Sequence, residues 1–335
     1  FGLSAMRLAV SACLAAHQRR LRPDNEYLDV SQAAIRRTLP LLAYLPFKLT
    51  TAALRDAAGL DPSPEGERVK TWLTQQRGTF APVMPFDPRE DPVLVLDLGV
   101  TSPLVSADPR ENSEPLITAR VDAAMREAGV RVAIGQYDEP RLLYSSPLFA
   151  GAESPLDERR TIHLGLDIFC DAGTPVHAPL RGTVHAFAYN PASLDYGGVI
   201  ILRHTTDDGT EFFSLYGHLG RSSLTGMATG RVIERGERFA ALDPPDENGG
   251  WTPHLHLQLF TDLLGLGTDV PGVVRPSQRS TWGAICPDPN LIVGIPAERF
   301  PPAAPDKADT LATRRRLFGH NLSIAYRETL KAVRG

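Results

Sequence analysis

His163-Leu-Gly-Leu-Asp167 is the most informative stretch of this sequence. In a strand, side chains alternate between two faces, so His163, Gly165 and Asp167 share one face while the two leucines point into a core. Gly165 leaves open space between two side chains that can bind a metal. The stretch therefore predicts a strand with one metal-binding face.

A second stretch, residues 254–259, reads His-Leu-His-Leu-Gln-Leu and repeats this arrangement. His254 and His256 project to one side of the predicted strand and the leucines to the other. Two neutral imidazoles and one carboxylate are a common catalytic zinc set that leaves a fourth position for water. His218 ends another strand-like run and can reach the same pocket. Each pattern alone also arises by chance, since a single strand histidine is more often a packed or surface residue.

The surroundings of both stretches, residues 160–260, have the pattern of a β structure. Short β-branched or alternating runs are separated by turns about every 8–12 residues, which is typical of an all-β sandwich or barrel. The runs are Thr183–Ala188, Gly198–Arg203, Glu211–Tyr216, Arg231–Ile233 and His254–Phe260. Residues 1–60 have apolar positions at helical spacing, and residues 93–150 read as strand, helix and strand. The predicted fold class is therefore α+β, with antiparallel sheets preceded by helices and a small extension.

Several stretches resemble the lysostaphin-type (β-lytic) zinc metallopeptidases in order and spacing. Besides the two histidine stretches, they are residues 172–179, 182–184, 197–204 and 215–219. The resemblance covers about residues 160–262, and it implies a metallopeptidase domain over residues 151–298.

The resemblance also implies roles for five residues. His163, Asp167 and His256 match the zinc ligands of that family. His218 and His254 match the pair that flanks the metal-bound water, where one serves as general base and the other stabilises developing charge. The sequence leaves open which of the two is the base. All five residues are present, which argues against an inactive copy.

The chain departs from the family pattern before the second histidine stretch. Family members usually carry a Gly-rich run there, whereas residues 241–252 read Ala-Leu-Asp-Pro-Pro-Asp-Glu-Asn-Gly-Gly-Trp-Thr. Because this segment is expected to line the cleft, the substrate stays open. His177, His185 and His204 are interpreted as surface or packing residues.

The flanking segments resemble other proteins. Residues 1–60 resemble the C-terminal helices of an aminoglycoside-phosphotransferase-like kinase domain, and residues 61–92 are expected to be a linker. Residues 299–335 resemble a linker and the opening of a class III aminotransferase. This order is similar to bacterial fusions, so the implied partners are neighbouring kinase-like and aminotransferase-like domains of the same polypeptide. Pyridoxal phosphate would belong only to a neighbouring domain outside this chain.

Composition excludes several classes of partner. The formal net charge is −4, and the sequence has no basic stripe, so we expect no nucleic acid. No apolar run approaches the roughly 20 residues that cross a bilayer, so we expect no membrane partner. The three cysteines are few, odd in number and widely spaced, and they imply no disulfide framework.

The sequence thus predicts a zinc metallopeptidase that hydrolyses a peptide or amide bond through a zinc-bound water. Its substrate would be a peptide or a small amide. Most of the family cuts peptidoglycan cross-links after export. The suspected fusion instead favours a location in the cytoplasm, because the kinase-like and aminotransferase-like domains need cytoplasmic cofactors. Two alternatives remain: a docking module, or an accessory domain in a pyridoxal-phosphate-dependent aminotransferase/kinase fusion.

Overall fold

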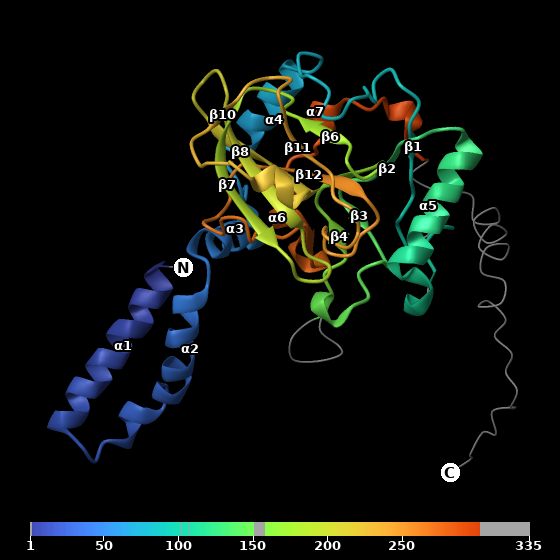
Figure 1. Cartoon of the computed structure of the whole chain (residues 1–335). Helices are drawn as coiled ribbons and strands as arrows, with labels where there is room; N and C mark the ends of the chain where they lie inside the picture. Colours follow the sequence, from blue (N-terminus) through green and yellow to red (C-terminus); the bar gives the residue numbers. More distant parts are fainter. Residues whose placement is uncertain (1, 101, 107, 151–157, 302–335) are drawn as a thin grey trace, which may run out of the picture.

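The computed structural model describes residues 2–100, 102–106, 108–150 and 158–301 (Figure 1). The α-helices are α1 (Gly2–Leu21), α2 (Gln32–Tyr44), α3 (Phe47–Ala57), α4 (Gly66–Gln75), α5 (Glu114–Ala128), α6 (Arg279–Ile285) and α7 (Asn290–Val293). The strands are β1 (Leu94–Val95), β2 (Ala133–Gly135), β3 (Glu139–Pro140), β4 (Ile162–His163), β5 (Leu166–Phe169), β6 (Pro175–His177), β7 (Gly182–Asn190), β8 (Gly197–Thr205), β9 (Glu211–Leu219), β10 (Val232–Ile233), β11 (Arg238–Ala241), β12 (His254–Phe260) and β13 (Val273–Val274). Short 3-10 helices lie at Glu26–Asp29, Pro109–Asn112, Pro147–Phe149, Arg221–Leu224, Pro276–Gln278 and Ala297–Arg299.

A large sheet organises the molecule. Its eight strands run in the order β1-β2-β5-β12-β9-β8-β7-β10, and all neighbours are antiparallel except β1 and β2. Two smaller sheets, β11-β6 and β13-β4-β3, complete the strand structure. The predicted α+β class with antiparallel sheets is confirmed.

Hydrophobic cores cover both faces of this sheet. On β8, Ile200 and Leu202 lie in one core, while Val199 and Ile201 lie in the other. Because successive strand residues face opposite sides, both sets are buried only if both faces are covered. This explains why the sequence of β8 is a continuous apolar run rather than an alternation with polar residues.

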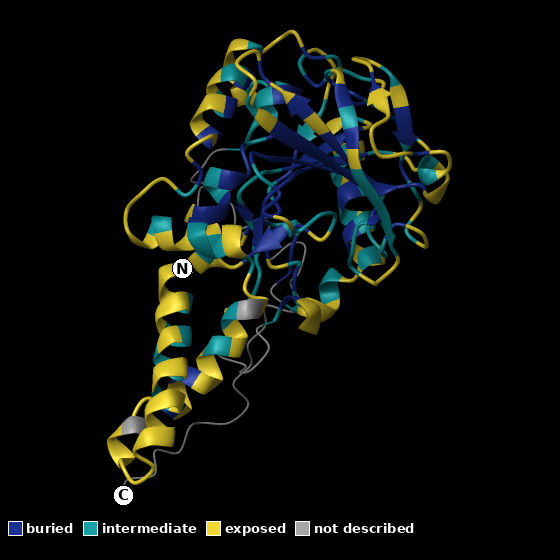
Figure 2. Ribbon diagram, turned by 90° about the vertical axis from the view of Figure 1, so that its left-hand side faces the viewer, coloured by how far each residue is buried: buried dark blue, intermediate teal, exposed yellow. Residues whose placement is uncertain are grey.

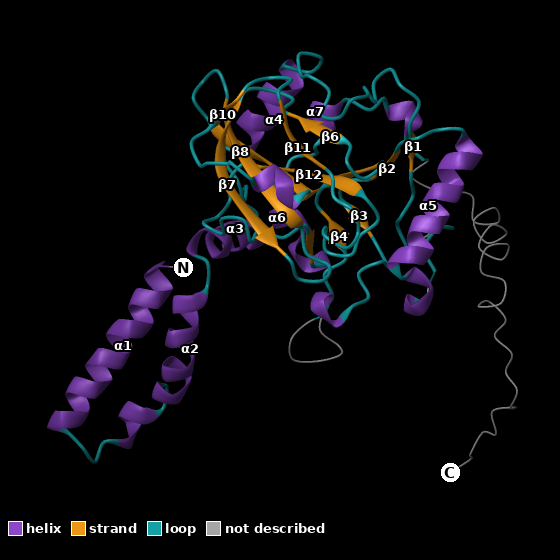
Figure 3. Cartoon of the chain, viewed as in Figure 1, coloured by secondary structure: helices purple, strands orange, loops and turns teal. Residues whose placement is uncertain are grey.

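The predicted strand–helix–strand extension is present and continues the large sheet. β1 and β2 are parallel and connected through α5 (Figure 3). β2 pairs with β5, and Gly135 lies opposite Asp167. A third core of residues from β1, α5 and β5 holds this unit in place, including Ile117, Val121 and Phe169. The extension therefore lies directly beside one predicted metal ligand.

The helices before the extension divide into two groups. α1 and α2 form a hairpin that projects from the β structure, and no residue of α1 is buried (Figure 2). α3 is joined to the body by an ion pair of 2.8 Å between Lys48 and Asp262. In the segment expected to be a linker, α4 buries Val69 and Leu73 in one of the two main cores. Within the described residues, no helix combines the length and apolarity that crossing a bilayer requires.

Candidate metal centre

The predicted single strand from His163 to Asp167 is wrong, because the chain leaves one sheet and enters another between them. His163 ends β4 in the three-stranded sheet, whereas Asp167 belongs to β5 in the large sheet. Gly165 lies at the crossing, and a Cβ there would come within 2.4 Å of Cε1 of His256. The glycine therefore makes room for the ring of a ligand, rather than for the metal itself.

The second histidine stretch forms β12, as predicted. Its three leucines are buried in a main core and both histidines lie on the other face. His256 lies opposite Asp167 of β5 and opposite Gly217 of β9. Because directly opposed strand residues have adjacent side chains, the pairing register brings the imidazole and the carboxylate together.

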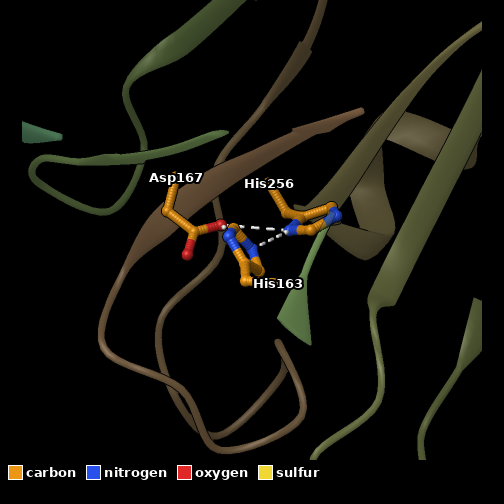
Figure 4. Close-up of side chains that lie close together, drawn as sticks. All are labelled: His163, Asp167 and His256. Atoms are coloured by element: carbon orange, nitrogen blue, oxygen red, sulfur yellow. Dashed lines mark hydrogen bonds and ion pairs between the residues drawn. The ribbon is translucent and has the colours of Figure 1, made fainter. Parts of the chain in front are cut away.

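Three possible ligand atoms converge at this point (Figure 4). Oδ1 of Asp167 lies 3.2 Å from Nε2 of His163 and 3.0 Å from Nδ1 of His256. The two ring nitrogens are 3.1 Å apart. A tetrahedral zinc with bonds of 2.0–2.1 Å has ligand atoms roughly 3.3 Å apart, so this triangle fits one face of such a site.

The outer hydrogen bonds of both imidazoles fix their tautomers. Nδ1–H of His163 donates to the carbonyl oxygen of Gln136 at 2.9 Å, so its Nε2 is free of a proton. Nε2–H of His256 donates to Oε1 of Gln258 at 2.9 Å, and the amide of Gln258 is oriented by donating to the carbonyl of Pro271 at 3.2 Å. Both lone pairs therefore point at the carboxylate, as metal ligands require.

Charge states in the site also suit a cation. Burial, together with the positive charge of Arg141, lowers the pKa of His163 to about 4. Burial opposes ionisation of Asp167, but His163 and Arg141 outweigh it and hold the pKa of Asp167 well below its usual value. At neutral pH the site thus presents neutral imidazole and ionised carboxylate, the protonation states that bind metal.

The two other predicted histidines lie beside the triangle. Nδ1–H of His218 donates to the carbonyl of Asn248 at 3.0 Å, and Nδ1–H of His254 donates to the carbonyl of Thr252 at 2.6 Å. Their ring centres are 4.3 Å apart, and Nε2 of His254 lies 3.6 Å from Oδ1 of Asp167. Burial lowers the pKa of both imidazoles. The structure therefore brings together all five predicted residues, with two unprotonated Nε2 atoms next to the metal-binding triangle.

His218 is held in an unusual backbone conformation. Its φ is +61°, in the left-handed region that residues other than glycine rarely occupy. Its N–H donates to the carbonyl of Tyr196 at 2.8 Å, and its own carbonyl accepts from the N–H of Asp243 at 3.2 Å. Such strain persists only where surrounding contacts impose it, and it is concentrated at functional sites.

A cavity of about 520 Å³ opens onto these five side chains. The expectation that residues 241–252 line the cleft is met by Gly250, Trp251 and Thr252. Another part of the wall comes from the extension, a contribution that sequence reasoning missed. Its lining residues are Leu98, Pro109, Asn112, Ser113, Glu114, Ile117, Arg141, Leu143, Tyr144, Ser145, Ser146, Leu148 and Phe149.

The three histidines that were interpreted as surface or packing residues behave as expected. His177, His185 and His204 do not line the cavity. His204 is buried elsewhere, where its Nδ1–H donates to the carbonyl of Arg181 at 2.9 Å and its Nε2 lies 2.7 Å from Oγ of Ser214. These contacts agree with a packing role.

Two supporting residues were missed by sequence reasoning. Gln258 lies two positions after His256 on the same strand face, so strand alternation was a signal that could have found it. Arg141 contacts Asp167 from a strand connection 26 residues earlier in the chain. Only the folded arrangement reveals that contact.

Comparison with known proteins assigns the segment that carries the site. Residues 161–264 match the model of peptidase family M23, which places a metallopeptidase-family domain over all five residues. An uncharacterized metalloprotease of Haemophilus influenzae is 34% identical over 114 residues, which cover 34% of this chain and 22% of that protein. An L-Ala–D-Glu endopeptidase of Bacillus subtilis is 30% identical over 108 residues, which cover 31% of each chain.

A solved structure shows the same kind of similarity. The catalytic domain of lysostaphin from Staphylococcus simulans is 22% identical, with 40% of this chain and 80% of that chain covered and a TM-score of 0.28. The chain spans about a fifth to a third of the length of the curated relatives named above.

The family match supports the prediction of a metallopeptidase domain of the lysostaphin type for residues 161–264. The predicted domain boundaries and the neighbouring kinase-like and aminotransferase-like domains stay predictions. Of the segment 299–335, residues 302–335 lie outside the described part of the chain.

Proposed function

We propose that this chain carries a zinc-dependent peptidase that hydrolyses a peptide or amide bond at His163, Asp167 and His256. One observation carries the proposal: three unprotonated ligand atoms converge in a cleft that also contains two further imidazoles with free Nε2 atoms. Each of the five residues is 5% exposed or less. Burying so many electron-pair donors together is costly unless a cation joins them.

The donor set favours zinc over other metals. Two nitrogen donors and one carboxylate oxygen leave one open position of a tetrahedron, as in catalytic zinc sites, whereas magnesium and calcium prefer oxygen ligands. When bound, zinc lowers the pKa of water and polarises the substrate carbonyl.

The chain's own residues would move the proton. His218 and His254 are neutral at pH 7, because burial lowers their pKa values. Either Nε2 can accept a proton, and the carboxylate of Asp167, 3.6 Å from Nε2 of His254, would stabilise the imidazolium formed there. The buried surroundings strengthen this attraction and exclude competing water.

The cleft fits a peptide or a small amide. Its lining includes the partly exposed Trp251 and, from the extension, Tyr144, whose ring centres are 6.3 Å apart. The Bacillus subtilis relative is named for cleavage between L-Ala and D-Glu, so peptides of that kind belong with glycine-containing peptides in the first substrate panel. The proposal also includes the cytoplasmic location predicted from the sequence, which is tested separately from activity.

The decisive experiment compares zinc content and hydrolysis in three variants. His256→Ala should lose both metal and activity, because it removes a ligand. His218→Ala should keep its metal while turnover falls by roughly 10²–10⁴, the usual effect of losing an acid–base group. His177→Ala, outside the cavity, is the matched control and should resemble the wild-type protein.

Two outcomes would overturn the proposal. One is hydrolysis that persists in His256→Ala. The other is wild-type protein that binds no zinc when zinc is supplied, which would leave the docking module as the better account.

A further inference from the structure

The guanidinium of Arg141 makes several hydrogen bonds beside the metal-binding triangle. Nη1 donates to Oδ2 of Asp167 at 2.6 Å, and Nε donates to Oε2 of Glu139 at 2.7 Å. Nη2 donates to the carbonyl oxygen of Gln136 at 3.1 Å. The side chain of Arg141 is 3% exposed, so these contacts form away from bulk water.

The two oxygens of Asp167 therefore have different surroundings. Oδ2 is taken by the guanidinium, while Oδ1 faces the ring nitrogens of His163 and His256. We propose that Arg141 is a positioning residue for the metal centre, which restricts Asp167 to binding the metal through Oδ1 alone. This inference rests on the proposed function, because it assigns a role towards the metal of that site.

Arg141 also reaches a second ligand. The carbonyl oxygen of Gln136 accepts from Nη2 of Arg141 and from Nδ1 of His163. The carbonyl of Gln136, which fixes the tautomer of His163, thus also connects this imidazole to the guanidinium of Arg141. Groups that orient ligands in this way typically change metal affinity 10–100-fold when they are removed.

The local sequence makes room for this arrangement. A Cβ at Gly135 would lie 2.7 Å from Nη2 of Arg141, so any larger residue at this position of β2 would displace the guanidinium. Glu139 is held in turn, because its Oε1 accepts from the backbone N–H of Leu98 at 2.8 Å. Buried ions stabilise a site only when they are paired with good geometry, and this pairing meets that condition.

If the charge of Arg141 dominated, removing this residue would raise the metal affinity of the site instead of lowering it. A positive charge next to a metal cation repels it, so loss of the arginine should tighten metal binding if charge dominates. Positioning predicts weaker binding. The sign of the change in affinity therefore separates the two accounts.

The double variant Glu139→Gln/Arg141→Met isolates positioning. It removes one negative and one positive charge, so the net charge around Asp167 is unchanged while the hydrogen bond from Nη1 to Oδ2 is lost. We expect its zinc affinity, measured by competition with a chromophoric chelator, to fall 10–100-fold. Arg89→Met is the matched control, because Arg89 forms a similar carboxylate pair with Asp87 outside the cavity. Its zinc affinity should equal that of the wild-type protein.

The Co²⁺-loaded proteins provide a readout that mere loss of stability would not produce. If Asp167 can bind through both oxygens once Arg141 is gone, the ligand number rises and the visible absorption of Co²⁺ weakens. Gly135→Ala is a second variant, which keeps every charge and should also lower zinc affinity. It provides the test if the double variant does not fold.

The outcomes distinguish this inference from the proposed function. Wild-type protein without zinc overturns both. Wild-type protein that binds zinc, with variants that bind it as tightly and give the same Co²⁺ spectrum, overturns the role of Arg141 and leaves the peptidase proposal standing.

Discussion

The left-handed backbone at His218 predicts an unusual difference between two substitutions. His218→Ala and His218→Gly both lose the imidazole, its hydrogen bond to Asn248 and its contacts with Trp251 and His254. These losses cancel when the two variants are compared. What remains is the backbone at φ +61°, which costs an alanine about 1–2 kcal/mol and a glycine almost nothing. Glycine loses about 0.5–1 kcal/mol more entropy on folding, so His218→Gly should be the more stable by about 1 kcal/mol.

Urea unfolding of both variants, with the metal removed by chelator, measures this difference directly. Zinc-loaded turnover should be reduced equally in the two, because neither has an imidazole at this position. If His218→Ala proves as stable as His218→Gly, then the surrounding contacts do not impose strain at this residue, and the argument from its backbone fails.

Two further predictions concern the same chain. Burial lowers the pKa of His204 to about 4 from its ordinary 6.5, so the unfolded state binds more protons at this residue between these pH values. His204 alone should therefore lower the unfolding free energy of the metal-free protein by about 3 kcal/mol as the pH drops from 6.5 to 4. Urea unfolding at several pH values should show a shallower fall in His204→Gln, and parallel profiles would exclude His204 as a source of acid sensitivity. Gln258→Met removes the acceptor for Nε2–H of His256 and should weaken zinc binding about 10-fold, whereas Gln258→Glu keeps an acceptor and should bind zinc nearly as the wild type does. Equal affinity in Gln258→Met, measured by chelator competition, would show that Gln258 does not set the tautomer of His256.

Sequence patterns predicted the parts of the fold that depend on local periodicity. The strand at 254–259 has leucines on one face and histidines on the other, and this alternation survives in β12 because the leucines enter a core. The strand–helix–strand order of the extension was predicted for the same reason. What periodicity did not show is that β2 of this extension pairs with β5. Pairing between strands depends on contacts distant in sequence, which no local pattern contains.

The candidate site, like the fold, was predicted only in part. Its five residues could be named because the resemblance to the lysostaphin-type peptidases assigned their roles, whereas histidines and a carboxylate at strand spacing were weak evidence on their own. The break between His163 and Asp167 was not predicted, because a glycine between two alternating residues is compatible with a continuous strand and with a crossing between sheets. Arg141 gave no signal at all, as its partners Glu139 and Asp167 meet it only in three dimensions.

The position of the ligands on two different sheets affects how long a metal would stay bound. His163 belongs to the small sheet β13-β4-β3, while Asp167 and His256 belong to adjacent strands of the large sheet. Short strands on small sheets open locally more often than the centre of a large one. Each opening of the small sheet would withdraw one of three ligands, so local opening of β4, rather than global unfolding, would limit the residence time of a bound ion. Conversely, a bound ion cross-links the two sheets and suppresses that opening in proportion to its affinity.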